Sequence, residues 1–184
     1  MALKATICKV LLQIADMDRQ LYADHSRTLA RHPSETDERM MIRLLAFALN
    51  VPATEDNGVL EFGKDMWDAD EPALLQQDLT GRIGHWIDVG QPDEKRVLRT
   101  TSRAGRVSIY SFGGSTTAWW SGIDTRVTRL RNLSVWQIPP DQSRALAGLA
   151  QRSMRLQVTV QDGGVWMGDD LRSVEVVPLR LCGG

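Results

Sequence analysis

The stretch DLTGRIGHWIDVGQPD, residues 78–93, most constrains what this chain can fold into. Its Thr80-Gly81 pair lies between two short apolar runs, and a turn signal in that position is typical of a β-hairpin. We expect the hairpin strands over residues 73–79 and 82–89. A Gly-Gln-Pro sequence then breaks the second strand, so a buried strand here passes almost directly into a helix.

An acidic residue, Asp88, lies near the end of the second predicted strand. The helix that follows carries Lys95, Arg96 and Arg99 in its first turns. A carboxylate at the exit of a buried strand, facing a basic helix, can hold a divalent metal against a phosphate. The same arrangement also ends ordinary strands, so both interpretations stay open at this point.

The two-residue turn predicts the register of the hairpin, in which Ala73 faces Asp88. In that register Asp78 and Asp88 lie roughly 17 Å apart, at about 3.4 Å per residue. They are too far apart to share one metal. We therefore expect Asp78 to bond to the amides of the turn, and Asp70 or Glu71 to lie closer to Asp88.

The segment ARHPSETDERMMIRLLAFALN contains the clearest helix in the chain. Ser34 is a suitable N-cap, and acidic residues follow it where the helix dipole favours them. Apolar residues then recur at helical spacing, and Glu38 leans toward that buried side. Glu38 is either a helix-start acid or a ligand. We expect Arg39 and Arg43 on the solvent side, with Glu35 pairing to Arg39.

The remaining segments predict an α/β protein with a mixed central sheet, helices on its faces, and an additional antiparallel sheet formed by the N- and C-terminal strands. We expect a single domain, residues 1–184, with a core of about 33–153. The terminal segments 1–32 and 154–184 form the second sheet. Within the last segment, Gly163-Gly164 predicts a hairpin turn, and SVEVVPLRL predicts one strand.

Composition limits the class of protein. Apolar residues make up 42% and charged residues 24%, as in ordinary globular proteins. The net charge of −1 means that any affinity for nucleic acid must come from a local patch. Cys8 and Cys182 have no metal-ligand spacing, which favours a reduced, cytoplasmic protein. Lysines interrupt the apolar opening segment, so we expect no signal sequence and no membrane span.

Arg96, Arg99 and Arg103 follow each other at spacings of three and four residues on the predicted helix. A basic stripe beside an acidic pocket suits a nucleic-acid backbone, because cations position the polymer. A solvated helix face has the same pattern, so the stripe alone does not decide between them.

Six blocks together resemble the YaeQ family of small bacterial proteins: MALKATICKV, ARHPSETDERMMIRLLAFAL, DLTG, WIDVGQPDEKR, NLSVW and MRLQVTVQDGGVW. The resemblance implies a restriction-endonuclease-like fold with a variant PD-(D/E)XK nuclease motif. It implies that Glu38 matches the helix acid of that motif and that Asp88 matches the acid of its acid-x-lysine strand. Such sites use Mg²⁺ or Mn²⁺ to activate water and to stabilise charge on the scissile phosphate.

The sequence departs from that motif at two positions. Gly90 stands where the lysine is expected, so Gln91 or Lys95 would have to supply a donor. Ala73 stands where an acid is expected before the hairpin, so Asp70 or Glu71 would have to replace it.

Two functions follow from these departures. One is a Mg²⁺-dependent nuclease with Asp88, Gln91 and Lys95 as catalytic groups. Its metal ligands would be drawn from Glu38, Asp70, Glu71 and Asp88. The other is a catalytically degraded nuclease-fold module that binds nucleic acid or a protein partner.

Overall fold

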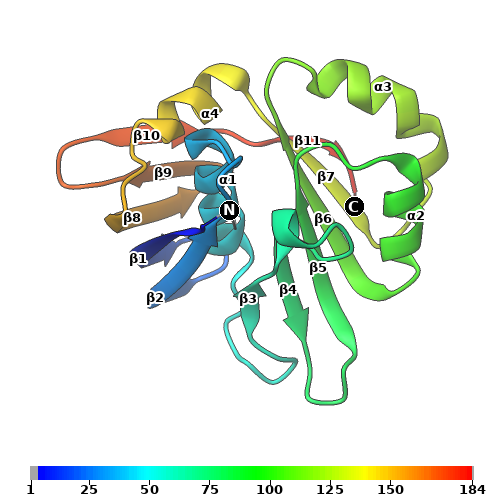
Figure 1. The fold of residues 1–184 in the computed structure, drawn as a ribbon, viewed down its shortest axis with the longest axis horizontal. Coiled ribbons are helices and arrows are strands. Elements are labelled where there is room, and N and C mark those ends of the chain that lie inside the picture. The colour runs from blue at the N-terminus through cyan, green and yellow to red at the C-terminus, as the bar shows by residue number, and fades with distance from the viewer. Residues whose placement is uncertain (1–3, 184) are drawn as a thin grey trace. The chain divides into compact units, whose positions relative to one another are not determined.

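The computed structural model describes residues 4–183, so the first three residues and Gly184 of the predicted terminal segments lie outside it. Figure 1 shows the elements in chain order. They are β1 (Thr6–Asp16), β2 (Leu21–Arg31), α1 (Asp37–Asn50), β3 (Leu60–Phe62), a 3₁₀ turn (Asp65–Trp67), β4 (Leu74–Gln77), β5 (Ile83–Val89), α2 (Glu94–Thr101), β6 (Ala104–Phe112), α3 (Thr116–Val127), β7 (Leu133–Ile138), α4 (Pro140–Ala147), β8 (Ser153–Gln161), β9 (Gly164–Gly168), β10 (Ser173–Val176) and β11 (Leu179–Cys182).

The chain divides into two compact units. The first contains the described residues up to Leu49 together with Asp141–Pro178, and the second contains Asn50–Pro140 and the residues from Leu179 onward. The first unit has a five-stranded sheet of order β10-β9-β8-β1-β2. The second has a six-stranded sheet of order β11-β7-β6-β5-β4-β3. Both sheets are mixed, and four α-helices accompany them, so the predicted α/β class is confirmed.

The five-stranded sheet brings the two terminal segments together, as the sequence predicts, but not with the predicted polarity. Along β1 the side chains of Cys8, Val10, Leu12 and Ile14 are buried while their neighbours are more exposed, which is the period of two of a strand. β1 runs antiparallel to β2 but parallel to β8. The expectation of an antiparallel sheet was therefore wrong. A parallel pair needs a long connection, and the chain between β1 and β8 provides it.

The end of the chain contains a second correction. The predicted strand SVEVVPLRL is two strands, β10 and β11, interrupted at Val177 and Pro178. A proline has no amide hydrogen to donate to a strand neighbour, so pairing stops there. β10 pairs with β9 in the five-stranded sheet, whereas β11 pairs with β7 in the six-stranded sheet. The β8–β9 turn residues are Asp162 and Gly163, both with positive φ, rather than the predicted pair of glycines.

Helix α1 begins two residues later than the predicted cap implies. The hydroxyl of Thr36, not that of Ser34, accepts from the amide of Arg39 at 3.1 Å. The predicted pair of Glu35 and Arg39 is present at 3.0 Å. Arg43, however, is buried with 3% of its surface exposed, so its expected solvent position was wrong. Its guanidinium donates to both oxygens of Glu35, at 2.7 and 2.6 Å.

The six-stranded sheet is built around the β5-α2-β6-α3-β7 succession, in which β5, β6 and β7 are parallel. Figure 1 shows α2 and α3 on the same side of this sheet. Apolar side chains from both helices and from the central strands form the core between them, among them Trp86, Val97, Val107, Ile109 and Val127. β6 lies between β5 and β7, the central position that its apolar sequence predicts.

The β4–β5 hairpin keeps most of its predicted register. Leu74 faces Ile87 and Gln76 faces His85, but the pairing shifts at Gly84 and the connection is longer than two residues. Asp78 accepts hydrogen bonds from the amides of Thr80 and Arg82 at 2.8 and 3.0 Å. The hydroxyl of Thr80 and these amides hold the pKa of Asp78 below its usual value. Asp78 therefore closes the turn, as expected.

Candidate functional site

Asp88 is buried near the end of β5, with 5% of its surface exposed. The indole Nε1 of Trp86 donates to its Oδ1 at 3.0 Å. Trp86 and Asp88 are two residues apart on one strand, so their side chains extend from the same face of the sheet. The sequence analysis does not identify Trp86 as a partner of Asp88, although their spacing of two residues on one strand indicates that the two side chains share a face.

The second partner of Asp88 is Arg96, in the first turn of α2. Its Nε donates to Oδ2 and its Nη2 to Oδ1, both at 2.9 Å, so the guanidinium and carboxylate form a two-pronged ion pair. The hydrogen bond to Asp88 is the main cause that raises the pKa of Arg96 above its usual value. The guanidinium also lies 5.6 Å from the centre of the Trp86 ring. Both oxygens of Asp88 are thus engaged by protein donors.

Arg96 also holds the segment that precedes β4. Its Nη2 donates to the carbonyl of Glu71 at 2.9 Å, and its Nη1 donates to the carbonyl of Ala69. One guanidinium therefore joins α2, β5 and residues 69–71. Arg96 was predicted to contact nucleic acid, but in this structure the described contacts of its guanidinium are with the protein itself.

The local sequence explains why Arg96 reaches Asp88. The carboxylate of Asp93 accepts from the amide of Arg96 at 2.7 Å and so caps α2, which places Arg96 at the start of the helix. Before it, Gly90 has φ +115° and donates to the carbonyl of Tyr110 at 2.9 Å. That backbone conformation favours glycine. A lysine at this position, as the nuclease motif would have, would be strained.

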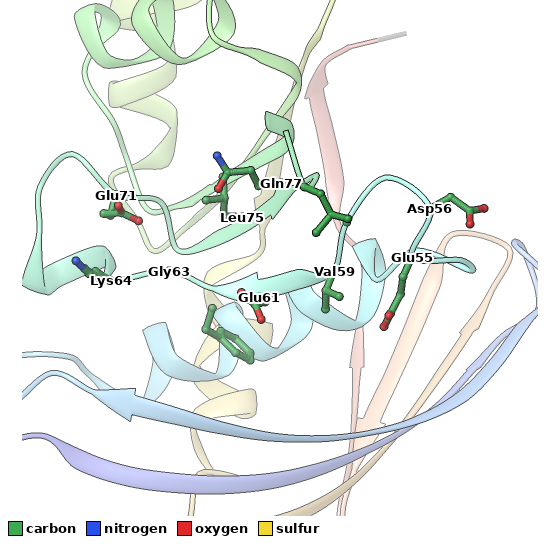
Figure 2. A pocket seen from close by; sticks show the side chains of 12 residues that line it. Glu55, Asp56, Val59, Glu61, Gly63, Lys64, Glu71, Leu75 and Gln77 are labelled. Atoms are coloured by element: carbon green, nitrogen blue, oxygen red, sulfur yellow. The ribbon is translucent and has the colours of Figure 1, made fainter. Parts of the chain in front are cut away.

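The two acids proposed to replace the missing pre-hairpin ligand point elsewhere. Asp70 is exposed and forms an ion pair with Arg99 at 3.0 Å. The side chain of Glu71 lines a cavity of about 570 Å³ along β3. Figure 2 shows Glu71 and Lys64 at one end of this cavity, and Glu55 and Asp56 at the other. Four acids line this cavity, so it does not suit an anionic polymer.

Glu38 belongs to the first unit. The hydroxyl of Ser143 donates to its Oε1 at 2.5 Å and so joins α1 to α4. Gln91 and Lys95 belong to the second unit. The amide of Gln91 donates to the hydroxyl of Ser115 at 2.9 Å, at the start of α3, and Lys95 is exposed. Neither Gln91 nor Lys95 has a described hydrogen bond to Asp88.

Three arginines at the ends of α2 and α3 are exposed: Arg103, Arg129 and Arg131. The side-chain amide of Asn132 donates to the carbonyls of Thr101 and Ala104, at 2.9 and 3.0 Å. This bridge holds the segment after α3 against the end of α2, so the arginines extend from adjoining segments. The sequence predicts Arg103 as part of a basic stripe, but the sequence analysis does not group it with Arg129 and Arg131.

The residues around Asp88 do not fit a magnesium site. Three donors from Trp86 and Arg96 already bind the two oxygens of Asp88, so Mg²⁺ would have to compete with them for this carboxylate. Among residues 4–183, no group of three or more His, Cys, Asp or Glu side chains is arranged to hold a metal ion. The arginine fork supplies the positive charge that this acid requires.

Within the described part of the chain, every helix is too short or too polar to span a bilayer.

Comparison with known proteins gives the family. The family model described as YaeQ protein matches residues 1–178. YaeQ of Escherichia coli strain K12 is 40% identical over 178 residues, which cover 96% of this chain and 95% of that protein. YaeQ of Salmonella typhi is 39% identical over the same shares of the two chains.

Two crystal structures of YaeQ proteins are also similar. The protein from Xanthomonas axonopodis pv. citri aligns with a TM-score of 0.92 at 45% identity, covering 98% of this chain and 100% of that one. The protein from Pseudomonas syringae aligns with a TM-score of 0.89 at 36% identity, covering 98% and 97%. Sequence and structure agree over nearly the whole chain, and the protein therefore belongs to the YaeQ family.

Proposed function

We propose that this protein is a catalytically degraded, nuclease-like module that acts in the cytoplasm and binds the phosphate backbone of nucleic acid without cleaving it. The observation that carries the proposal is the two-pronged ion pair between Asp88 and Arg96. It occupies the acid that a nuclease of the implied type needs for its metal.

Releasing Asp88 would be costly. Arg96 would lose both hydrogen bonds to the carboxylate, and its bonds to the carbonyls of Ala69 and Glu71 hold it beside Asp88. Hydrogen bonds to charged groups contribute about 1.5–3 kcal/mol each. A metal would have to compensate for these losses before it contributed to catalysis. The other expected ligands are also engaged: Asp70 with Arg99, and Glu38 with Ser143 in the first unit.

The surface that suits a phosphate backbone is the group of exposed arginines Arg103, Arg129 and Arg131. Asn132 holds the segments that carry them together, so their charges reinforce one another. Neighbouring arginines are partly neutralised, Arg99 by Asp70 and Arg126 by Glu94. Arginines bind phosphate oxygens in forks, and such contacts position a polymer without reading its sequence.

A binding and cleavage assay tests the proposal. We would measure fluorescence anisotropy of labelled single-stranded DNA, duplex DNA and RNA, with Mg²⁺ or Mn²⁺ present, and analyse the same samples on denaturing gels. We expect binding that weakens with salt, and intact substrate. The triple variant R103Q/R129Q/R131Q should bind more weakly and lower the salt slope by about one for each phosphate that an arginine no longer neutralises.

The matched control is R152Q/R155Q, which removes exposed arginines of the first unit and should leave binding unchanged. Cleavage that is present in the wild type and lost in Asp88→Ala would support the metal-dependent nuclease instead. An absence of binding to all three substrates would refute the nucleic-acid proposal and would favour a protein partner for the same surface.

A further inference from the structure

The cavity of about 570 Å³ along β3 lies on one face of the six-stranded sheet. Glu61 faces Leu75 across β3 and β4, and Leu75 faces Trp86 across β4 and β5, so the three side chains extend from the same face. Trp86 belongs to the core between this face and helices α2 and α3, whereas Glu61 is exposed. The cavity therefore lies at the open end of a sheet face whose other end is packed.

Apolar side chains form part of the lining of this cavity. Leu79 is fully exposed, Val59 is exposed, and Leu75 is half-buried beside them. Isolated exposed apolar side chains are common on proteins, but a group of them surrounded by charged residues is typical of an interaction site. This end of the sheet thus has an apolar surface that a ligand can cover.

The charges around the apolar surface are mostly negative. Glu55, Glu61 and Glu71 line the cavity, and within residues 4–183 their carboxylates have no described hydrogen bond or ion pair. Asp56 accepts a hydrogen bond from a threonine hydroxyl at 2.9 Å, which leaves its charge in place. Four acids and one lysine, Lys64, give the described lining a net charge of −3. A ligand of this cavity must therefore be positively charged.

Figure 2 shows how the charges are distributed along the cavity. Glu71 and Lys64 lie at one end, where their charges balance. Glu61 lies in the middle and Glu55 at the other end, and both are exposed. The excess negative charge is thus spread along the apolar surface and is not gathered at one point. A matching ligand carries cations that are spaced apart, with apolar groups between them.

We propose that this cavity binds a short basic segment of a partner protein, in which apolar side chains lie between lysines or arginines. The apolar side chains pack on Val59, Leu75 and Leu79, and the cations pair with Glu55 and Glu61. Exposed ion pairs contribute little affinity by themselves, so the apolar contact supplies most of it and the acids select a basic partner. The arginines proposed above for nucleic acid are not part of this surface, so the two proposals can fail separately.

Fluorescence anisotropy of labelled peptides with the full chain at low ionic strength tests the proposal. The probe is the peptide KKLVLKK, which places apolar residues between two basic ends. The peptide EELVLEE reverses its charges, and KKGSGKK removes its apolar residues. We expect saturable binding of KKLVLKK that weakens with added salt, and binding of the other two peptides that is at least about tenfold weaker.

Three variants of the protein locate the binding. E55Q/E61Q should weaken KKLVLKK binding about tenfold, because each exposed ion pair contributes up to about fivefold. L79S should weaken it about threefold or more, and because Leu79 is fully exposed the fold does not depend on it. The matched control is D24N/E175Q, which removes two exposed acids on β2 and β10 of the first unit and should leave binding unchanged.

Two further readouts do not depend on a loss of binding. K64Q removes the cation from the lining and should strengthen KKLVLKK binding about twofold or more, a gain that a folding defect cannot produce. In nuclear magnetic resonance spectra of the wild type, the amide signals of residues 58–63 and 75–79 should move as the peptide is added. The amide signals of β8 in the first unit should stay in place.

Several results would overturn the proposal. They are binding of EELVLEE or KKGSGKK as tight as that of KKLVLKK, unchanged affinity in E55Q/E61Q, and weaker binding in K64Q. Amide signals that move in the first unit and not at residues 58–63 would place the peptide elsewhere. Spermidine is added as a competitor, and displacement of KKLVLKK by an equal or lower concentration of it would assign the cavity to a small polyamine instead.

Discussion

Each unit of this protein buries a carboxylate against an arginine fork, and the two pairs differ in how far the arginine is enclosed. In the first unit the side chains of Glu35 and Arg43 are 1% and 3% exposed. In the second unit those of Asp88 and Arg96 are 7% and 20% exposed. The first pair is closed to water on both sides. The second pair leaves part of the Arg96 side chain exposed to solvent.

The difference shows what each pair does. Glu35 also accepts from Arg39, and its carbonyl accepts from Arg31, so the first pair joins the end of β2 to helix α1. The role of the Glu35–Arg43 pair is therefore structural. Arg96 instead reaches from the helix to a strand and to a loop, and it lies over Trp86. Because Arg96 is partly exposed, this second pair can be rearranged at a lower cost than the first.

The largest effect is expected from Glu35→Gln, which leaves Arg43 buried with a weaker partner. Breaking an enclosed ion pair from one side costs about 3–5 kcal/mol. Urea unfolding would measure the loss in the free energy of unfolding. Asp37→Asn, at the exposed partner of Arg31, is the control and should change it by less than about 1 kcal/mol. Similar losses in the two variants would contradict the structural role of Glu35.

Asp88→Asn should cost less, about 2–3 kcal/mol, because the guanidinium of Arg96 can reach water. Its loss, measured in the same urea experiment, should fall between those of the two first-unit variants. A double-mutant cycle with Arg96→Met would give the coupling between the two residues. A loss as large as that of Glu35→Gln would remove the distinction between the two pairs.

A third buried contact of the protein makes its stability depend on pH. Nη2 of Arg106 lies 2.8 Å from Nδ1 of the buried His85. An unfolded histidine titrates near pH 6.5, whereas His85 in the folded protein titrates at about 3. Above pH 6.5 both states are neutral, so the shift contributes nothing. As the pH falls below 6.5, only the unfolded state gains the proton, and stability is lost until about pH 3. We expect a loss of about 2 kcal/mol at pH 5 relative to pH 7.

Unfolding at several pH values would measure this slope, and His85→Gln should remove its share. If the variant and the wild type lose stability in parallel below pH 6.5, His85 is not a buried neutral ring.

The smallest effect is expected at the exposed pair of Asp70 and Arg99, whose side chains are 77% and 39% exposed. Asp70→Asn should change the free energy of unfolding by less than about 1 kcal/mol. A loss of several kcal/mol on urea unfolding would show that this pair, rather than the Asp88 fork, holds residues 69–71 in place.

Local patterns in the sequence predict much of this architecture. The alternation along β1 and the turn chemistry of Asp78 identify these elements, because side-chain period and turn geometry are local properties. The cap at Asp93 is predictable for the same reason. Strand polarity is not local. The parallel pairing of β1 with β8 depends on where the chain returns, and no pattern within either strand encodes it.

The contacts of Arg43 and Arg96 show the same limit of prediction from the sequence. Arg43 interrupts a run of apolar residues, MMIRLLAFA, and such an isolated charge signals a buried pair rather than a solvent contact. Its acid partner is eight residues away, outside the usual helix spacings. Helical spacing is visible in the sequence, and it predicts Arg96 as part of a basic stripe with Arg99 and Arg103. That it turns back onto Asp88 depends on the strand–helix packing of the second unit.

The pairing of the terminal strands also affects how the protein is made. β1 leaves the ribosome before its parallel partner β8, which follows only after all of Asn50–Pro140 has been synthesised. β7 likewise pairs with β11, which is synthesised after β8, β9 and β10. A nascent chain therefore carries two unpaired strand edges, a known route to aggregation. We expect the native pairing of both sheets to be completed only after β11 has been synthesised.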